Sequence, residues 1–196
     1  MDPKHQIIKA AVHLIAQKGF AATSIREIAM MASVNISMIN YYFFNKNSLL
    51  DNILKGAVQK ISEKIQHGQV EGQTEMEKLF AFIQAQIEYV SQQHEIAKIF
   101  FQEELVKNSQ AVLEFRQLNY QNFEAIINEG HRKDVFSKTV QPELLYSTIV
   151  GTIQQFVVKY LSQNVHANYT LSEEFFNHTE ELTAYLKLLC SRMLLK

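Results

Sequence analysis

The sequence predicts an all-α protein, and three observations carry that prediction. The 196 residues include only six glycines and two prolines, too few for the many turns of a sandwich or a barrel. Hydrophobic residues make up 47% of the chain and charged residues 20%, which is typical of a globular protein with a real core. Apolar side chains recur every three or four residues along nearly the whole chain, which is the helical period.

The first helix begins at Pro3, a residue suited to a first helical turn, and ends before Gly19, which suits the position after a last turn. Ser24 offers an N-cap for a second, short helix. Glu27 follows Ser24 at the spacing of a capping box. We therefore expect this second helix over about 25–31.

A third short helix is predicted over about 35–42, after a turn of only a few residues. Its inward positions are Ile39 and Phe43, which lie four residues apart on one face. Asn45 can cap a long fourth helix over about 46–67.

The interval from Gly68 to Gly72 is predicted to be a linker, and the rest of the chain continues the helical pattern. This makes about nine helices in all, with a three-helix helix-turn-helix domain in front of a helical bundle. We expect one domain over 1–47 and a second domain over 48–196, joined by the fourth helix. The later helices are expected at about 74–92, 95–107, 110–130, 142–162 and 172–195.

The net charge of −1 hides an asymmetry between the two parts of the chain. Residues 1–50 hold five basic and two acidic residues, a net charge of +3, whereas the remaining 14 basic and 18 acidic residues give −4. A basic end on an acidic body is a hint of nucleic-acid contact. A solvated face without a partner explains a net charge of +3 about as well.

The second and third helices, behind a longer first helix, have the outline of a helix-turn-helix, which presents its last helix to the major groove. The positions that this helix leaves exposed carry amide, hydroxyl, aromatic or apolar groups and no acid. Such groups can pair with adenine edges, phosphate oxygens and thymine methyls. They are Asn35, Ile36, Ser37, Met38, Asn40 and Tyr41.

Residues 5–55 resemble the DNA-binding domain of the TetR family of bacterial transcriptional regulators. The combination is far more specific than a general helix-turn-helix pattern, and it covers about a quarter of the chain. The matching residues are Ile8, Ala11, Leu14-Ile15, Gly19-Phe20, Thr23-Ser24-Ile25-Arg26-Glu27-Ile28-Ala29, Ala32-Ser33-Val34-Asn35, Ile39-Asn40-Tyr41-Tyr42-Phe43, Lys46 and Leu49-Leu50.

The resemblance implies DNA contacts at several positions of this sequence. Phosphate contacts at the start of the second helix are implied for Thr23, Ser24 and Arg26. Base-facing positions are implied for Asn35, Ile36, Ser37 and Met38. Further contacts are implied for Asn40, Tyr41, Tyr42 and Lys46.

The sequence departs from the family pattern at three positions. Ser33 replaces the usual glycine of the turn and must tolerate the turn geometry at some cost in strain. Ser37 stands where a second small residue, commonly glycine, is typical. Asn40 replaces a tyrosine that contacts phosphate, which leaves open whether Asn40 meets a phosphate or a base. Lys46 could also be an ordinary surface lysine.

The resemblance further implies that the domain over 1–47 binds DNA, that the domain over 48–196 binds an effector and dimerises, and that the protein is a homodimer. Two apolar stripes on the last two long helices are candidates for the interface, and Gly151 in mid-helix would allow another helix to approach closely. The alternative is that both stripes are core within one chain. The residues that we expect at the interface are Ile149, Ile153, Phe156, Tyr160, Tyr185, Leu189 and Met193.

A ligand pocket in the C-terminal bundle is also implied, and the aromatic residues that crowd the middle of the chain favour an apolar or aromatic small molecule. Most of these aromatic side chains must be core, and a minority could line a cavity. The expected ligand contacts are His94, Phe101, Asn119, Tyr120, Phe123 and Gln155.

No enzyme, metal or cofactor motif is recognised. His94-Glu95 lacks the second histidine of the zinc-protease pattern, and no phosphate-binding glycine loop or nucleophile elbow occurs. His178 with Glu181 has helical spacing but no further ligand, so a solvated pair is the favoured interpretation. Without a signal peptide or an apolar run of membrane-spanning length, the chain is expected to be cytoplasmic.

Two functional hypotheses follow. The first is a DNA-binding repressor that a ligand releases from its operator. The second is a helical protein–protein adaptor that retains a helix-turn-helix but does not bind DNA with it. The acid-free exposed face of the third helix favours the first.

Overall fold

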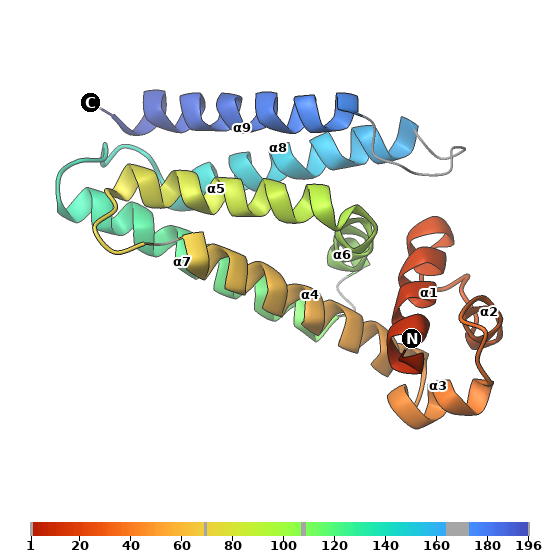
Figure 1. The fold of residues 1–196 in the computed structure, drawn as a ribbon. Helices are drawn as coiled ribbons and strands as arrows, with labels where there is room; N and C mark the ends of the chain where they lie inside the picture. Colours follow the sequence, from red (N-terminus) through yellow and green to blue (C-terminus); the bar gives the residue numbers. More distant parts are fainter. Residues whose placement is uncertain (1, 69, 107–108, 164–172, 196) are drawn as a thin grey trace. The chain divides into compact units, whose positions relative to one another are not determined.

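The computed structural model describes residues 2–68, 70–106, 109–163 and 173–195, and it confirms the all-α fold. These residues form nine helices and no strand (Figure 1). The helices are α1 (Pro3–Lys18), α2 (Ile25–Met31), α3 (Ile36–Phe43), α4 (Lys46–Gly68), α5 (Glu75–Gln92), α6 (His94–Val106), α7 (Gln110–Arg132), α8 (Pro142–Gln163) and α9 (Glu173–Leu194).

Side-chain caps explain several of the helix starts. Ser24 and Glu27 close the predicted capping box at α2. Thr74 and Glu77 close a second capping box at α5. The Asn45 side chain accepts a hydrogen bond of 2.8 Å from the backbone N–H of Ser48, as a cap of α4 should. Caps of this kind lie within three residues of their partners, which is why the sequence predicts them.

The chain divides into two compact units. The first unit comprises Met1–Lys60 and Glu95–Phe115, and the second comprises Ile61–His94 and Arg116–Lys196. The predicted boundary between residues 47 and 48 separates the DNA-binding role from the effector-binding and dimerisation role. It is not a boundary between compact units, and it stays a prediction.

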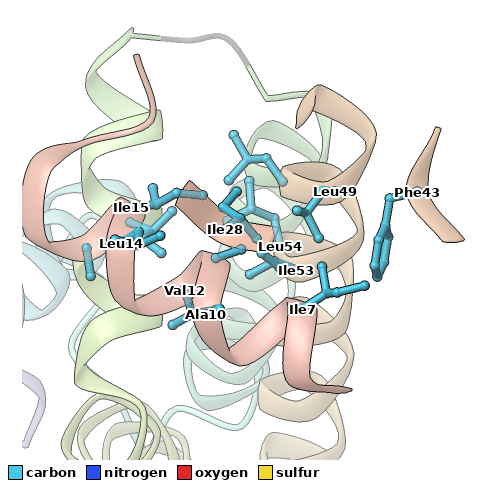
Figure 2. Packing of buried hydrophobic residues seen from close by; sticks show 14 of the residues in the cluster. Ile7, Ala10, Val12, Leu14, Ile15, Ile28, Phe43, Leu49, Ile53 and Leu54 are labelled. Atoms are coloured by element: carbon cyan, nitrogen blue, oxygen red, sulfur yellow. The ribbon is translucent and has the colours of Figure 1, made fainter. Parts of the chain in front are cut away.

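The core of the first unit is apolar. Ile7 and Ile15 of α1, Ile28 of α2, Phe43 of α3 and Leu54 of α4 are all buried in one cluster (Figure 2). Burial of each such side chain stabilises the fold by roughly 1.5–3 kcal/mol. Because α3 fully buries only Ile39 and Phe43, its other side chains, apart from the half-buried Met38, are left outside this core.

Part of α6 and the start of α7 belong to the same core. Ile99 is fully buried in the cluster, and Phe100 packs against it from α6. A polar contact adds to this packing, since His13 Nδ1 and Glu95 Oε1 are 2.8 Å apart. The helices that hold the helix-turn-helix thus include α6, which the sequence pattern alone assigns to the C-terminal bundle.

In the second unit, α5 packs against both α8 and α9, and these two helices pack against each other (Figure 1). Gly130 of α7 lies so close to the Phe136 ring that a Cβ atom would overlap it, at 2.0 Å. Cys190 of α9 is fully buried, and burial raises the pKa of its thiol to about 12. The thiol is therefore a packing group.

Candidate functional site

The exposed face of α3 is the first candidate site. Asn35, Ser37, Asn40 and Tyr41 are exposed, and Ile36 is 39% exposed. Met38 is half-buried and packs against the core. No acidic residue lies in α3, so the face offers hydrogen-bonding and apolar groups without a charge that would repel phosphate.

Asn35 also has a structural role. It is the N-cap of α3, and its Oδ1 accepts a hydrogen bond of 3.0 Å from the backbone N–H of Ser37. The amide NH₂ group of the same side chain remains on the exposed face. One residue thus fixes the start of α3 and presents donors at its N-terminal end.

Strained residues stand on both sides of α3. Ser33, before the helix, has φ 54°, and Phe44, directly after it, has φ 65°. Both are in the left-handed region that favours glycine, at a cost of roughly 1–2 kcal/mol each. The strain expected at Ser33 is confirmed, whereas Phe44 was not predicted. Strain of this kind concentrates at functional sites.

Three residues that are predicted to contact phosphate lie at the start of α2, and they differ in solvent exposure. Ser24 and Arg26 are exposed. Thr23 is buried, and its hydroxyl donates to the carbonyl of Gly19 at 2.8 Å. The Lys18 ammonium, together with the Ser24 hydroxyl and amide, lowers the pKa of Glu27 to about 2. Glu27, the acidic residue of α2, is therefore already paired with Lys18.

Lys46 holds the chain segment in front of α2. Its Nζ donates to the carbonyls of Phe20 and Thr23, both at 2.9 Å, and lies 4.2 Å from the centre of the Phe20 ring. A lysine ammonium has three hydrogens, and these two bonds use two of them. Lys46 thus ties the first turn of α4 to the approach to α2.

The two tyrosines of α3 differ in exposure. Tyr41 is 83% exposed, whereas Tyr42 lies closer to the core side and its ring is 6.2 Å from that of Phe43. The Tyr41 and Tyr42 rings meet edge to face at 5.2 Å. Tyr42 is therefore partly anchored by its ring, whereas Tyr41 extends into solvent.

A buried chain of hydrogen bonds crosses the second unit and is the second candidate site. Gln86 Nε2 of α5 donates to Asn119 Oδ1 of α7 at 2.7 Å, and Asn119 Nδ2 donates to the Tyr146 hydroxyl of α8 at 3.1 Å. All three residues are buried. We call Gln86, Asn119 and Tyr146 the polar junction.

Aromatic rings lie beside the polar junction, and we call Phe82, Tyr120, Phe123 and Tyr146 the aromatic wall. The Tyr146 ring packs edge to face on Tyr120 at 5.3 Å and lies 5.4 Å from Phe123. Phe123 in turn lies 5.6 Å from Phe82 of α5. A small polar cluster next to aromatic side chains is a common composition of a small-molecule site.

Three of the six predicted ligand residues lie at this junction, namely Asn119, Tyr120 and Phe123. The structure does not bring the other three there, because Gln155 is exposed, Phe101 belongs to the first unit and His94 is half-buried at the start of α6. Sequence reasoning missed Gln86 and Tyr146. The available signal for Gln86 was an amide within an otherwise apolar stripe of α5.

A surface groove of about 320 Å³ lies between α5 and α9. Its lining combines apolar surface, from residues such as Ile87, with the polar side chains of Glu88 and Lys187. None of the predicted ligand residues lines it. The groove and the polar junction are therefore separate features of the second unit.

The predicted dimer residues divide by burial. Ile149 and Ile153 are buried within the chain itself, which leaves no side-chain surface for a second copy. Phe156 and Leu189 are half-buried. Tyr185 and Met193 are 57% and 43% exposed. The side chain of Tyr160 lies outside the described residues.

Gly151 is exposed on α8, and no atom lies within 4 Å of the position that a Cβ would take. No helix of the described chain approaches it closely. In the described parts of the chain no group of three metal-ligating side chains occurs, and none of the helices there is long and apolar enough to cross a membrane.

Two family models match the chain. Residues 7–53 match the model described as bacterial regulatory proteins of the tetR family. Residues 72–158 match the model described as the tetracyclin repressor-like C-terminal domain. The first match covers the helix-turn-helix and the second covers the polar junction.

Known proteins resemble the chain over most of its length. The fatty acid metabolism regulator protein of Bacillus subtilis (strain 168) is 30% identical over 167 residues, which are 81% of this chain and 84% of that protein. The structure of the ketosteroid regulator KstR2 of Mycobacterium tuberculosis superposes with a TM-score of 0.81 at 16% identity, over 100% of this chain and 96% of that one. The structure of FadR from Bacillus subtilis with stearoyl-CoA gives a TM-score of 0.68 at 24% identity, over 93% and 96%.

Proposed function

Because this chain belongs to the TetR family of bacterial regulatory proteins, we propose that it is a homodimeric repressor that a small apolar molecule releases from its operator. Family membership makes it a DNA-binding transcription regulator and not an enzyme. The single observation that carries the proposal is the acid-free exposed face of α3.

In this proposal α3 enters the major groove. The Asn35 amide and the side chains of Ile36 and Ser37 meet base edges near the N-terminal end of the helix. Asn40 and Tyr41, one turn further along, meet bases or phosphates. A bidentate contact from Asn35 to an adenine would discriminate against another base by about 1–3 kcal/mol.

Phosphate contacts then come from the start of α2 and from α4. Ser24 and Arg26 are exposed at the N-terminal end of α2, where the helix dipole also favours an anion. Thr23 acts by shaping this turn, because its hydroxyl is already bonded to Gly19. Lys46 has one ammonium hydrogen beyond its two carbonyl bonds for a phosphate oxygen.

The dimer is proposed to form on the exposed faces of α8 and α9. Tyr185, Leu188 and Met193 of α9 and Val158 of α8 are large apolar side chains in solvent. The open surface at Gly151 would admit a second copy. Two copies would place two reading helices about one turn of DNA apart, which matches a pseudo-palindromic operator.

The dimer is testable by sedimentation. Leu188→Glu should shift the chain from dimer to monomer, because it places a charge in the contact. Leu118→Glu is the matched control, since Leu118 is also exposed but lies on α7. A Leu188→Glu variant that stays dimeric would place the interface elsewhere.

The effector is proposed to act through the continuity of α5 and α6. Gln86 of the polar junction lies in α5, and Gln93 alone separates α5 from α6. Ile99 of α6 is part of the core that supports the helix-turn-helix of α2 and α3. A ligand that prefers a conformation of α5 in which the protein binds DNA weakly would therefore lower DNA affinity by linkage.

An apolar effector is supported by the aromatic wall and by what relatives bind or regulate. One relative is named for fatty acid metabolism, one solved structure holds stearoyl-CoA, and another is a ketosteroid regulator. These are different molecules with large apolar bodies. We therefore propose the class of effector and not one compound, and we expect the protein to act in the cytoplasm.

The central experiment is selection of a DNA site from randomised duplexes, followed by a gel shift at about 150 mM salt, where nonspecific binding is weak. The expected result is a pseudo-palindromic site bound at least about a thousandfold more tightly than random DNA. Asn35→Ser, which keeps the helix cap but removes the amide, should relax the preference at one position of each half-site.

Selection that yields no preferred sequence would remove the repressor proposal. The adaptor hypothesis would then gain support, because the exposed α3 face would be free for a protein. Equal loss of binding by Asn35→Ser on selected and random DNA would contradict the proposed role of Asn35 while leaving the regulator intact.

A further inference from the structure

We propose that Tyr89 and the polar junction bind the neutral carbonyl group of an otherwise apolar effector. This inference rests on the proposed function and specifies the chemistry of its effector site. Four observations carry it: a buried phenol without a partner, its place on α5, the neutral donors of the junction, and the aromatic wall.

Tyr89 of α5 is only 8% exposed, and its hydroxyl has no hydrogen-bond partner among the described residues. A buried polar group left unpaired in this way is destabilising. Burial also raises the pKa of Tyr89, so the phenol stays protonated and remains a donor. An unpaired buried donor of this kind favours a ligand that brings an acceptor.

Tyr89 lies on the same side of α5 as the polar junction. Phe82, Gln86 and Tyr89 follow each other at spacings of four and three residues, which places them on one helix face. All three are buried. The face therefore runs from the Phe82 ring, through the Gln86 amide, to the Tyr89 hydroxyl.

The junction itself is neutral and contains further donor capacity. The Gln86 and Asn119 amide nitrogens each carry two hydrogens, and the bonds to Asn119 and Tyr146 each use one of them. The partners seen in the cluster are amides and phenols rather than cations. A carboxylate or phosphate would lose its hydration there without gaining a counter-charge, so a neutral acceptor such as a carbonyl oxygen fits better.

The rest of the ligand must be apolar. Phe82 and Phe123 pack beside the junction at a ring distance of 5.6 Å, and Tyr146 links this pair to Tyr120. These rings place apolar surface next to Tyr146 of the junction. An acyl thioester with a long alkyl chain and a ketosteroid share the required chemistry, one carbonyl on a large apolar body.

The test compares pairs of probes that differ by the carbonyl oxygen alone. One pair is stearoyl-CoA and its thioether analogue S-octadecyl-CoA. The other is a ketosteroid and its counterpart without the keto oxygen. Calorimetric titration of the full chain should show about tenfold tighter binding of the carbonyl member in at least one pair.

Tyr89→Phe should abolish this preference, with affinity for the carbonyl member falling about tenfold and affinity for the analogue unchanged. The same variant should melt at the same temperature as the wild type or higher, because it removes an unpaired hydroxyl. Gln92→Ala is the control, because Gln92 is exposed on the same helix as Tyr89, and it should change neither quantity.

The inference is overturned if the wild type binds neither member of either pair, if it binds both members of each pair equally, or if Tyr89→Phe keeps the preference. Each protein is also assayed on the selected DNA site. Specific DNA binding together with any of those results removes the carbonyl site alone. Loss of specific DNA binding by the wild type would instead remove the proposed function.

Discussion

The core beneath α3 in the first unit and the interior around α5 and α7 in the second unit differ in chemistry. Around α1, α2, α3 and the first turns of α4 the core is made of aliphatic and aromatic side chains, and Thr23 is the polar side chain buried there. The second unit instead buries Gln86, Asn119 and the unpaired hydroxyl of Tyr89. A DNA-binding helix needs a rigid support, whereas a ligand site needs polar groups that can form hydrogen bonds to a ligand.

The largest expected effect tests the apolar side of this comparison. Ile39→Ala should lower the free energy of unfolding by about 3 kcal/mol, because it opens a cavity under α3. Ile36→Ala makes the same chemical change on the same helix at an exposed position and should cost less than about 1 kcal/mol. Denaturant unfolding followed by helical signal measures both.

The comparison would break if Ile36→Ala were as destabilising as Ile39→Ala, since Ile36 would then be core and not part of a DNA-reading face. We expect the reverse pattern in DNA binding by the folded proteins. There, Ile36→Ala should weaken the selected site.

The next effect tests the polar interior. Asn119→Leu should cost about 2 kcal/mol, because it leaves the buried amide of Gln86 and the hydroxyl of Tyr146 without this partner. Asn128→Leu, at an exposed position of the same helix, is the control. The double variant Gln86→Leu/Asn119→Leu should recover part of the loss, because both polar partners are then replaced by apolar groups.

Simple addition of the two single effects in that double variant would show that Gln86 and Asn119 do not act as a pair. The second unit would then be stabilised like the first, and the contrast between the interiors would lose its energetic meaning.

A smaller effect is expected at the strained ends of α3. Ser33→Gly should raise the stability of the first unit by about 1 kcal/mol, because glycine adopts the positive φ without strain. Ser37→Gly, within the helix, should lower it by a similar amount. Thermal unfolding of the two variants separates the outcomes, and a loss of stability in Ser33→Gly would show that Ser33 is not strained.

The smallest effect concerns Glu103, a buried acid of α6 in the first unit. Burial, and then the nearby Asp51 carboxylate, raise the pKa of Glu103. The stability that Glu103 contributes is thus fully present below the unfolded pKa of about 4.3 and is lost as the pH rises through the raised folded pKa.

Glu103→Gln should therefore gain stability relative to the wild type as the pH increases from about 4 to about 7. Glu114→Gln, at an exposed position, should show no such trend. Urea unfolding across this pH range provides the measurement. A constant difference between Glu103→Gln and the wild type would mean that the Glu103 carboxyl titrates normally.

The sequence predicts the helices closely because their ends depend on local chemistry. The Ser24–Glu27 capping box, the Asn45 cap and the left-handed Ser33 all involve neighbours in the chain, and the structure confirms each. Exposure along α3 was also predictable, because Ile39 and Phe43 already define its buried side.

The contacts that escaped prediction join distant residues. Lys46 reaches carbonyl oxygens of Phe20 and Thr23, more than twenty residues earlier, and backbone atoms leave no mark in a sequence pattern. The Gln86–Asn119 bond depends on how α5 and α7 are rotated about their axes. Periodicity shows which face of a helix is apolar, but it does not show which polar residue meets which across an interface.

The most direct test of the account is the affinity of the wild-type chain for its selected DNA site and for random DNA, each measured over a range of salt concentrations. We predict steep salt dependence on both, because phosphate contacts dominate nonspecific binding, and a preference for the selected site that persists at about 150 mM salt. Equal affinity for both duplexes at every salt concentration would contradict the claim that the exposed face of α3 reads DNA sequence.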